Sequence, residues 1–583
     1  MKKSKLILVF ITVMLLISSV NFVSFAQENS PSEENNDSSN LYQNLPLVET
    51  DLQKIFLPLV AKNFCVSPYE SPFSLQIAGL GDFTSTSTSS SMTKAEYDEM
   101  QKQALAELDA AFPSLVDALK ESGAGWARIY IDWAAIEPVK GVYNFSWYDE
   151  KLGLVASTGV KIIATIANPP AWAVVNPYGE KGSEWYGDDG ACSNVINETE
   201  LPAFDNFLVK LVGRYKVAPY LINTWEIMNE PDAVTGYRCL GGGLVTYGLE
   251  GDKYANLTKL SFQKIKSLDP SAKIILGGLA YDWFYDVGEI VSPDPKYFAS
   301  VVSPDGPFNR YFIDDYFAVE DSKNHIDAIN FHYFKDWSDH WEQWTQPDDE
   351  GYIKIPTCGD VADGLGTSYT PYGTGVIAKG SHIIERLKMC FGVTKPLWIS
   401  EVGHHGTDLI DDPIYDLDNQ ARYVWKVYPQ SLSLGAENVT WYALKIIRSV
   451  TPDDYQGLLY DDNSPKPAFY AYQTLTSELD GYKFDSIVNA GASNEAYKFY
   501  NPCDGYKIVA WLNTTDVGAI SIWDVPGVSK ISLKYRPYSD PEVNVSDHVV
   551  EDGVTETGDL DEVKNGSIRI GLTIEPVIIH LNP

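Results

Sequence analysis

Two glutamates follow apolar runs that have the composition of buried strands. Ile222–Ile227 is followed by Met228-Asn229-Glu230-Pro231, and Pro396–Ser400 is followed by Glu401. In a barrel of eight parallel strands, the active site forms at the carboxyl ends of the strands. Because nearly three strand–helix units separate the two glutamates, we expect them to face each other across the barrel mouth.

A facing pair of carboxyl groups is suited to cleaving a glycosidic bond. One acid protonates the leaving oxygen while the other carboxylate attacks the anomeric carbon, and the first group then returns as a base that activates water. This double displacement needs the two carboxyl groups about 5–5.5 Å apart, whereas inversion needs a wider gap. Repulsion between two such carboxylates raises the pKa of the acid and keeps it protonated near the working pH.

The segments that must position these glutamates alternate between short β-rich runs and amphipathic helical runs. This alternation predicts an α/β fold with a parallel sheet, and eight strands favour a closed (β/α)8 TIM barrel over an open sheet. The predicted strands are Ser74–Ala78, Trp126–Ile131, Lys161–Ile166, Ile222–Ile227, Lys273–Leu276, Asp327–Phe331, Pro396–Ser400 and Val439–Ala443. Helical runs between them include Lys94–Ala111, Trp147–Thr158, Ala203–Tyr215, Tyr254–Leu268, Gly375–Phe391 and Asp418–Leu434. No G-x-G-x-x-G or P-loop pattern follows a strand, so nucleotide binding has no support.

The chain changes character after about Ser477. Ala496–Tyr500 and Lys507–Leu512 flank Asp504-Gly505, which is a hairpin turn signal. Further short strands with turn residues and no helical pattern follow, which predicts an antiparallel β-sandwich. We therefore expect a catalytic barrel over residues 72–477 and a small sandwich over residues 478–583. The sandwich is either a sugar-binding module or a structural support packed on the barrel, and we favour the support.

Residues 1–26 have the pattern of a signal peptide, with lysines at the start, an apolar run from Leu6 to about Val20, and a small residue at Ala26. A retained membrane anchor is the alternative, but the run is shorter than the roughly 20 residues that a span needs. We expect a secreted protein, extracellular or associated with the cell surface, that is not inserted in a membrane. Residues 27–71 are predicted to form a disordered linker and N-terminal extension, because their first part is polar and rich in Glu, Asn and Ser.

Composition narrows the range of partners. The 44 basic and 79 acidic residues give a net charge of −35, which repels nucleic acid and anionic membranes and excludes both as main partners. The 15 Trp and 36 Tyr suit stacking on the flat faces of sugar rings. The six cysteines show no C-x-x-C spacing, and an exported protein can join them as disulfides. We favour pairing Cys192 with Cys239 and Cys358 with Cys390, since each bond would join neighbouring barrel loops.

Several segments of the predicted barrel resemble those of a large clan of enzymes, the retaining (β/α)8 glycoside hydrolases of clan A. The resemblance covers roughly residues 73–475 and is carried by the following segments: Asn229-Glu230-Pro231, Glu401, Trp126-Ala127-Arg128 through Asp132-Trp133, Ile136-Glu137-Pro138, Gly141–Phe145 and Val439–Tyr442. The predicted C-terminal sandwich is similar to that of glycoside hydrolase family 39. The chain also resembles family 5-like enzymes. The resemblance implies that Glu230, after strand four, is the acid/base and that Glu401, after strand seven, is the nucleophile.

The same resemblance suggests roles for five other residues. Asn229 matches an asparagine that hydrogen-bonds the sugar 2-hydroxyl, and Arg128 matches a strand-two arginine that supports the nucleophile. His332 and Tyr333, which end strand six, match residues that line the site, where the tyrosine often contacts the nucleophile. Trp441 matches the aromatic platform beneath the −1 sugar.

Each of these assignments has a structural alternative. Arg128 could pair only with a core acid such as Glu137 or Asp132, and His332 and Trp441 could be ordinary buried residues. For each of four other tryptophans, core packing and an outer sugar subsite are equally open interpretations: Trp133, Trp172, Trp185 and Trp225.

Metal catalysis and a serine nucleophile lack support in the sequence. His404 and His405 are adjacent rather than four residues apart, and neither H-E-x-x-H nor G-x-S-x-G occurs. We therefore expect no metal and no other cofactor, and the role of the two histidines stays open.

Two functions from different classes fit these observations. The first is a secreted retaining glycoside hydrolase that cleaves β-glycosidic bonds of poly- or oligosaccharides. The second is a non-catalytic carbohydrate-binding or cell-surface protein on the same scaffold, which the presence of both glutamates and Asn229 disfavours. The sugar, the linkage and the oligomeric state are left open. The insertions Pro169–Ser193 and Lys335–Tyr372 could form an exo-acting pocket or an endo-acting cleft.

Overall fold

The computed structural model describes residues 66–80, 94–175, 195–233, 247–248, 250–280, 312–337, 341, 372–408, 416–447, 455–537 and 548–582. The chain divides into two units, Met1–Val66 and Ser67–Pro583, and the described helices and strands belong to the second unit. The predicted signal peptide and most of the predicted linker lie outside the described residues. Within the described part of the chain, no helix is both long and apolar enough to cross a membrane.

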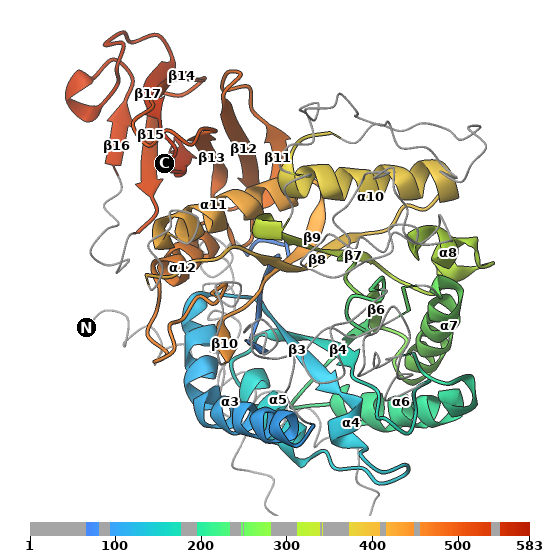
Figure 1. The fold of residues 1–583 in the computed structure, drawn as a ribbon. Coiled ribbons are helices and arrows are strands. Elements are labelled where there is room, and N and C mark those ends of the chain that lie inside the picture. Colours follow the sequence, from blue (N-terminus) through green and yellow to red (C-terminus); the bar gives the residue numbers. More distant parts are fainter. Residues whose placement is uncertain are drawn as a thin grey trace, which may run out of the picture. The chain divides into compact units, whose positions relative to one another are not determined.

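Eight parallel strands form the barrel (Figure 1). They are β1 (Phe73–Gln76), β3 (Trp126–Asp132), β4 (Lys161–Ala167), β5 (Thr224–Ile227), β6 (Lys273–Leu276), β7 (Ile329–Phe334), β8 (Leu397–Gly403) and β9 (Ala436–Trp441). The hydrogen-bonded order is β6-β5-β4-β3-β1-β9-β8-β7. Bridges from Ile275 to Ala328 and from Leu279 to Phe331 then join the first and last strands and close the ring. The predicted barrel and its eight strands are confirmed.

Helices surround this ring (Figure 1), and their buried apolar side chains share one hydrophobic core with the strands. In α6 (Leu201–Tyr215), buried residues recur three or four positions apart, from Phe204 and Phe207 to Leu211 and Tyr215. The other helices are α3 (Lys94–Ser122), α4 (Trp133–Ile136), α5 (Ser146–Ala156), α7 (Gly251–Leu268), α8 (Phe312–Ala318), α10 (Gly375–Phe391), α11 (Leu417–Ser433) and α12 (Pro467–Leu479). Short 3-10 helices are η2 (Glu198–Glu200), η3 (Ser322–Asn324), η4 (Lys335–Trp337) and η7 (Thr555–Thr557). A two-stranded parallel ribbon, β2 (Ala78–Leu80) with β10 (Lys445–Ile447), follows the ends of β1 and β9.

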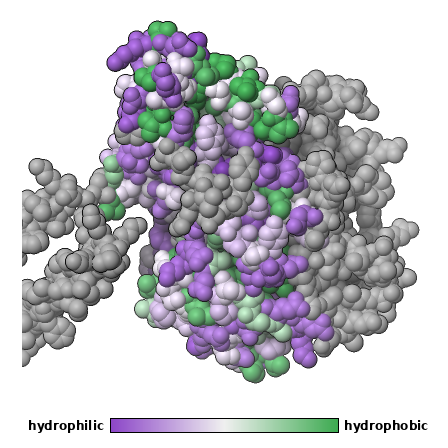
Figure 2. All heavy atoms as spheres, turned by 90° about the vertical axis from the view of Figure 1, so that its left-hand side faces the viewer, coloured by the Kyte–Doolittle hydropathy of each residue, from purple (hydrophilic) through white to green (hydrophobic). Residues whose placement is uncertain are grey.

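The C-terminal part is antiparallel, as predicted. A six-stranded sheet has the order β11-β12-β13-β18-β15-β16, and β14 pairs with β17 as a second sheet. The strands are β11 (Lys483–Ile487), β12 (Asn494–Asn501), β13 (Gly505–Leu512), β14 (Ser521–Pro526), β15 (Lys530–Tyr535), β16 (His548–Glu551), β17 (Ser567–Leu572) and β18 (Val577–Leu581). Figure 2 shows hydrophobic residues interspersed with hydrophilic ones over this part, and the exposed large ones include Val517, Ile520, Ile522 and Tyr535.

The large sheet has apolar side chains on both of its faces. Ala510, Ile531 and Ile579 pack in a core with residues of β14 and β17, whereas Tyr497 and Trp511 belong to the same core as the barrel helices. Ion pairs cross this second boundary. Arg422 of α11 donates to Glu575 at 2.6 Å, and Lys507 of β13 donates to Glu478 of α12 at 2.7 Å.

The described cysteines are Cys390 and Cys503, and both are disulfide-bonded. The other four cysteines lie outside the described residues, so the predicted pairings of Cys192 with Cys239 and of Cys358 with Cys390 stay predictions.

Candidate active site

The turn after β5 positions Glu230 with a backbone that ordinary side chains rarely adopt. Met228 and Glu230 have φ angles of 61° and 43°, and Asn168 at the end of β4 has a φ of 48°. Non-glycine residues seldom occupy this region, and those that do cluster at functional sites. The turn is anchored by hydrogen bonds from Met228 N to the Ile166 carbonyl, at 2.9 Å, and from Ala233 N to the Glu230 carbonyl, at 3.2 Å.

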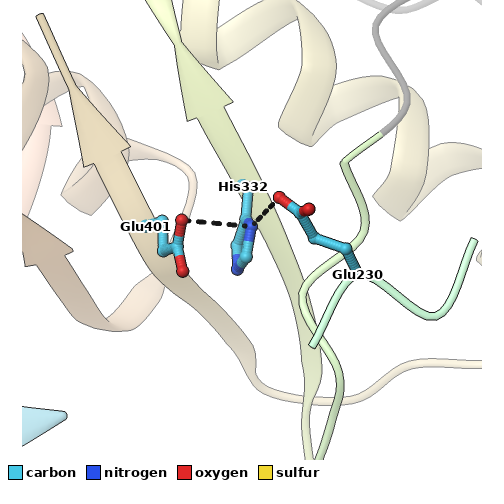
Figure 3. A group of neighbouring side chains, drawn as sticks. All are labelled: Glu230, His332 and Glu401. Atoms are coloured by element: carbon cyan, nitrogen blue, oxygen red, sulfur yellow. Dashed lines mark hydrogen bonds and ion pairs between the residues drawn. The ribbon is translucent and has the colours of Figure 1, made fainter. Parts of the chain in front are cut away.

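Glu230, His332 and Glu401 converge at the carboxyl ends of the strands (Figure 3). The His332 Nδ1 atom lies 2.9 Å from Glu230 Oε1 and 3.5 Å from Glu401 Oε2. One ligand atom from each of the three residues falls within 4.8 Å of the other two, so a carboxylate oxygen of Glu230 is within 4.8 Å of one of Glu401. The Glu230 side chain is 30% exposed, whereas that of Glu401 is 5% exposed. The structure therefore places one carboxyl group in a buried setting and the other at the opening.

An irregularity in β8 directs two consecutive side chains into the barrel. The register of β8 shifts against β7 between Phe331 and His332, and against β9 between Ile399 and Val402. Ser400 and Glu401 consequently both reach polar groups inside the ring, although neighbours on a regular strand point to opposite faces. Bulges of this kind commonly re-aim side chains beside active sites.

Arg128 is the central cation of the site and is fully buried. Its Nε atom donates to Glu226 at 2.7 Å, its Nη1 donates to Glu401 at 2.5 Å, and its Nη2 donates to the Asn229 side-chain oxygen at 2.8 Å. Burial lowers the pKa of the Arg128 guanidinium, but Glu226, Tyr130 and Glu401 outweigh that effect and hold the pKa well above its ordinary value. Arg128 therefore stays charged and compensates two carboxylates.

The two acids that could have paired with Arg128 instead accept hydrogen bonds from nearby backbone and side-chain groups. Asp132 accepts from Ala135 N at 2.9 Å as the N-cap of α4. Glu137 accepts from the Trp133 indole and from Gly141 N, each at 2.7 Å. The structure thus brings Arg128 to Glu401, as the resemblance implied.

Glu226 is a functional residue that the sequence analysis missed. It is fully buried, and its two oxygens accept from five donors: Arg128 Nε at 2.7 Å, Thr165 Oγ1 at 2.5 Å, Gly278 N at 3.2 Å, Asn330 Nδ2 at 2.7 Å and Ser400 Oγ at 2.9 Å. Burial raises the pKa of Glu226, but Arg128 and the other donors outweigh it, so the net shift is downward. A charged residue within an apolar strand was the available signal, because a buried charge needs a partner.

Tyr130 is the second residue that the sequence analysis missed. Its hydroxyl donates to Glu401 Oε1 at 3.0 Å. Burial and the nearby Glu401 raise the pKa of Tyr130 well above its ordinary value, so the phenol keeps its proton and acts as the donor. Tyr333, which the resemblance suggested for this contact, is next to His332 on β7. Since side chains alternate along a strand, Tyr333 points away from the barrel interior and packs in the hydrophobic core.

Trp441 lies at the end of β9 and is fully buried. Its indole N–H donates to the Gln456 carbonyl at 3.0 Å, and the Gln456 side-chain amide contacts His405 Nε2 at 3.1 Å. His404 and His405, whose role the sequence left open, both contact Asp336, with His404 Nδ1 at 2.6 Å and His405 Nδ1 at 3.3 Å from its oxygens. These contacts join the segments after β7, β8 and β10 around Trp441.

The other tryptophans differ in burial. Trp133 and Trp225 are fully buried core residues. Trp172 is partly buried, and its indole donates to the Glu137 carbonyl at 3.1 Å. Trp185 lies outside the described residues.

The group of Glu230, His332 and Glu401 also has the spacing of a metal site. Its neighbours do not suit a cation, because the permanently charged Arg128 lies 2.5 Å from Glu401. Both ring nitrogens of His332 are also engaged, with Glu230 and with Ser400, each at 2.9 Å. We therefore do not interpret the cluster as a metal site.

Comparisons with known proteins agree with this geometry. The family model for glycoside hydrolase family 42, described as beta-galactosidase, matches residues 109–241, a segment that includes Arg128, Asn229 and Glu230. The curated beta-galactosidase BgaH of Haloferax lucentense is 26% identical over 159 residues, which cover 25% of this chain and 23% of that protein. The chain thus aligns with about a quarter of that relative's length.

Among solved structures, a family 39 glycoside hydrolase from Bacteroides cellulosilyticus is similar in fold, with a TM-score of 0.53 and 18% identity. The match covers 81% of this chain and 78% of that one. A monomeric beta-xylosidase from Caulobacter crescentus has a TM-score of 0.50 and 14% identity, and the match covers 89% and 97% of the two chains. These findings confirm the resemblance to the clan of (β/α)8 glycoside hydrolases.

Proposed function

We propose that this protein is a retaining glycoside hydrolase that cleaves β-glycosidic bonds by double displacement, with Glu401 as nucleophile and Glu230 as acid/base. The observation that carries the proposal is the separation of the two carboxyl groups. Their nearest oxygens lie within 4.8 Å of each other at the barrel mouth. Retention needs about 5–5.5 Å between the carboxyl groups, whereas inversion needs about 6.5–9.5 Å to admit a water molecule.

The surroundings of the two glutamates assign their roles. Glu401 is nearly buried and receives hydrogen bonds from Arg128 and Tyr130, which compensate a negative charge and aim one oxygen. A nucleophile must be ionised when the substrate binds. Glu230 lies at the open side with 30% of its side chain exposed, which leaves it accessible to the leaving group and later to water.

The reaction then proceeds in two steps. An oxygen of Glu401 bonds to the anomeric carbon while the bond from that carbon to the leaving oxygen breaks, and the leaving oxygen takes the proton of Glu230. The Glu230 carboxylate next accepts a proton from water, whose oxygen bonds to the same carbon and releases Glu401. Neither step requires a metal or another cofactor.

Asn229 contributes a hydrogen-bond donor to the proposed −1 subsite. The Asn229 side-chain oxygen accepts from Arg128 at 2.8 Å, so its amide N–H groups are directed elsewhere and are available to the sugar 2-hydroxyl. Such a hydrogen bond strengthens in the transition state. Trp441, which the resemblance suggested as the platform beneath the sugar, is fully buried and its ring lies 6.2 Å from that of Tyr423 on α11, so it supports the end of β9 and offers no exposed face for stacking.

The substrate of this proposal is a carbohydrate with β-linkages, a poly- or oligosaccharide, and the N-terminal pattern supports a location outside the cell. Because the matched family model and curated relative are described as beta-galactosidases, aryl β-galactosides come first in a substrate panel. Other aryl β-glycosides and polysaccharides complete the panel, and resolving the product sizes separates exo from endo action.

Variants of the two glutamates test the mechanism. We expect Glu401→Gln to lose turnover by several orders of magnitude and Glu230→Gln to lose most activity on substrates with poor leaving groups. Glu121→Gln, on the exposed surface of α3, is the matched control and should behave as wild type. Ordinary hydrolysis by the Glu401 variant would refute the mechanism, and inactivity of the wild type on the entire panel would favour a non-catalytic binding protein.

Azide separates the two roles. A Glu401→Gly variant supplied with azide should form the α-configured glycosyl azide, because azide enters from the face that the nucleophile vacates. A Glu230→Ala variant with a dinitrophenyl glycoside should form the β-configured product instead. Exchange of these two outcomes would reverse the assignment.

A further inference from the structure

Three buried polar groups form a continuous hydrogen-bond chain from the barrel centre to Glu230. Glu226 contacts Ser400, Ser400 contacts His332, and His332 contacts Glu230, with each donor–acceptor distance at 2.9 Å. Glu226, Ser400 and His332 are 1% exposed or less. Counting donors and acceptors along this chain determines where its protons lie.

The count begins at Glu226, which can only accept. Its two oxygens face five donors, among them the permanently charged Arg128, and the net shift of its pKa is downward. An ionised carboxylate has no proton to give. The Ser400 hydroxyl, 2.9 Å from Glu226 Oε1, must therefore donate its proton to Glu226.

Asn330 fixes the other side of Ser400. The Asn330 side-chain oxygen accepts from Ser400 N at 2.9 Å, which orients the amide, and its Nδ2 then donates to Ser400 Oγ at 2.7 Å. The Ser400 oxygen has now used its only proton and one of its two lone pairs. Only an acceptor position remains for its third contact, so His332 Nε2 must carry a hydrogen and donate it to Ser400.

The proton on Nε2 determines the state of Nδ1. Charged groups around His332 are Glu230, Glu401, Glu226, Arg128 and Lys379, and burial is the largest influence, lowering the pKa of His332 to about 4. A neutral imidazole with a proton on Nε2 has a bare lone pair on Nδ1. That lone pair lies 2.9 Å from Glu230 Oε1, a distance that is a hydrogen bond only if Glu230 carries the proton.

We propose that Ser400 and Glu226 act as positioning residues that fix His332 in its Nε2–H form, so that His332 Nδ1 accepts a hydrogen bond from the protonated acid/base Glu230. The inference rests on the proposed function of Glu230. The hydrogen-bond chain thus stabilises on Glu230 the proton that the leaving group takes in the first step. Once Glu230 is ionised, its contact with Nδ1 joins two acceptors, which favours the return of a proton from water in the second step.

Gly278 allows His332 to occupy this position. A Cβ atom at residue 278 would lie 2.0 Å from His332 Nε2 and 2.2 Å from its Cδ2, closer than atoms can approach. The imidazole thus packs directly on the backbone that follows β6. The Gly278 N–H donates to Glu226 at 3.2 Å, so this glycine contacts both Glu226 and His332 of the hydrogen-bond relay.

Nuclear magnetic resonance of 15N-histidine-labelled wild-type protein tests the proton positions directly. The His332 signals are assigned by their loss in His332→Asn. Between pH 6 and 8 we expect a proton bonded to Nε2 and an unprotonated Nδ1. A proton on Nδ1, alone or together with one on Nε2, would overturn the inference. This measurement does not use turnover, so it stands apart from the proposed function, which the Glu401 variants test.

The pH dependence of kcat/KM gives a second readout. Ser400→Ala removes the acceptor of the Nε2 proton and frees His332 to place a proton on Nδ1, where it stabilises ionised Glu230. On a phenyl glycoside, whose leaving group needs protonation, we expect the alkaline limb to move to lower pH by about one unit, the size of one hydrogen bond. Ser400→Thr keeps the hydroxyl and should restore the wild-type limb.

Matched measurements exclude a general structural effect. Ser261→Ala removes another fully buried hydroxyl, on α7, and should leave the limb unchanged. With a dinitrophenyl glycoside, whose leaving group needs no proton, the shift of the alkaline limb of kcat/KM caused by Ser400→Ala should be absent. Gly278→Ala displaces His332 by another route and should move the limb in the same direction as Ser400→Ala. An alkaline limb of the Ser400→Ala variant that stays in place would count against the relay.

Discussion

Glu226 and Glu230 are separated by three residues, yet neutralising them should have very different effects on stability. Glutamine has the shape of glutamate but replaces one acceptor oxygen with an NH2 group. At the barrel centre, Glu226 is fully buried and its oxygens satisfy five donors. At the mouth, Glu230 is 30% exposed. We expect Glu226→Gln to be strongly destabilising and Glu230→Gln to be nearly neutral.

The magnitude is set by the partners that glutamine cannot satisfy. If its NH2 group occupies the Oε2 position, it faces Arg128 Nε, which cannot accept. If it occupies the Oε1 position, it faces Gly278 N and Asn330 Nδ2, which cannot accept either. Breaking a buried ion pair by removing one partner costs about 3–5 kcal/mol. Because Arg128 keeps its contact with Glu401, we expect Glu226→Gln to lower the free energy of unfolding by about 3 kcal/mol. Glu230→Gln should change it by less than about 1 kcal/mol.

Urea unfolding, followed by tryptophan fluorescence and by circular dichroism, measures both changes. Coincidence of the two probes checks that one transition is being compared across variants. Glu121→Gln, with an exposed side chain, supplies the baseline for a glutamate-to-glutamine change. The reasoning fails if Glu226→Gln unfolds within about 1 kcal/mol of wild type, or if Glu230→Gln is destabilised as much as Glu226→Gln.

Three further outcomes are expected from the contacts. Burial lowers the pKa of His332 to about 4, so below about pH 6.5 the unfolded chain binds a proton that the folded protein does not bind. The free energy of unfolding should therefore fall by up to about 3 kcal/mol as the pH drops from 6.5 to 4. This part of the pH dependence should be absent in His332→Asn, which melting curves at several pH values measure. Tyr130→Phe removes a hydrogen bond to the nucleophile and should lower kcat/KM about 10- to 100-fold on aryl glycosides without changing the circular dichroism spectrum. Deletion of residues 480–583 should leave an insoluble or unfolded barrel, because Tyr497 and Trp511 share the barrel's core; a soluble barrel with a native spectrum would contradict this.

The sequence predicted the barrel and its two glutamates because both depend on local pattern. Apolar runs alternating with amphipathic segments locate the strands, and a residue that follows a strand must lie at the mouth whatever the details of packing. Glu230 and Glu401 therefore needed no knowledge of register. The antiparallel C-terminal sheets were predictable for the same reason, from the hairpin turn at Asp504-Gly505 and the short strands around it.

The residues that were missed depend on register and on distant partners. Tyr130 and Tyr333 are both tyrosines in strands, and only the direction of each side chain decides which one reaches Glu401. Ser400 faces the interior because β8 is irregular at that point, which a sequence of apolar residues does not indicate. Glu226 was the easiest of these to predict, since a glutamate between Trp225 and Ile227 demands a buried cation, and Arg128 lies inside the apolar run two strands away.

The hydrogen bonds connect each of the two glutamates proposed as catalytic to the residue that precedes the other in the chain. Glu401 is held by Arg128, which also holds Asn229, the residue before Glu230. Glu230 is held by His332, which also holds Ser400, the residue before Glu401. A movement of either strand end is thus resisted by two independent bridges that converge on Glu226 through Arg128 and Ser400. Because the chemistry of retention depends on the spacing between the two carboxyl groups, a buried ionic centre that fixes this spacing contributes to function even where its net contribution to stability is small.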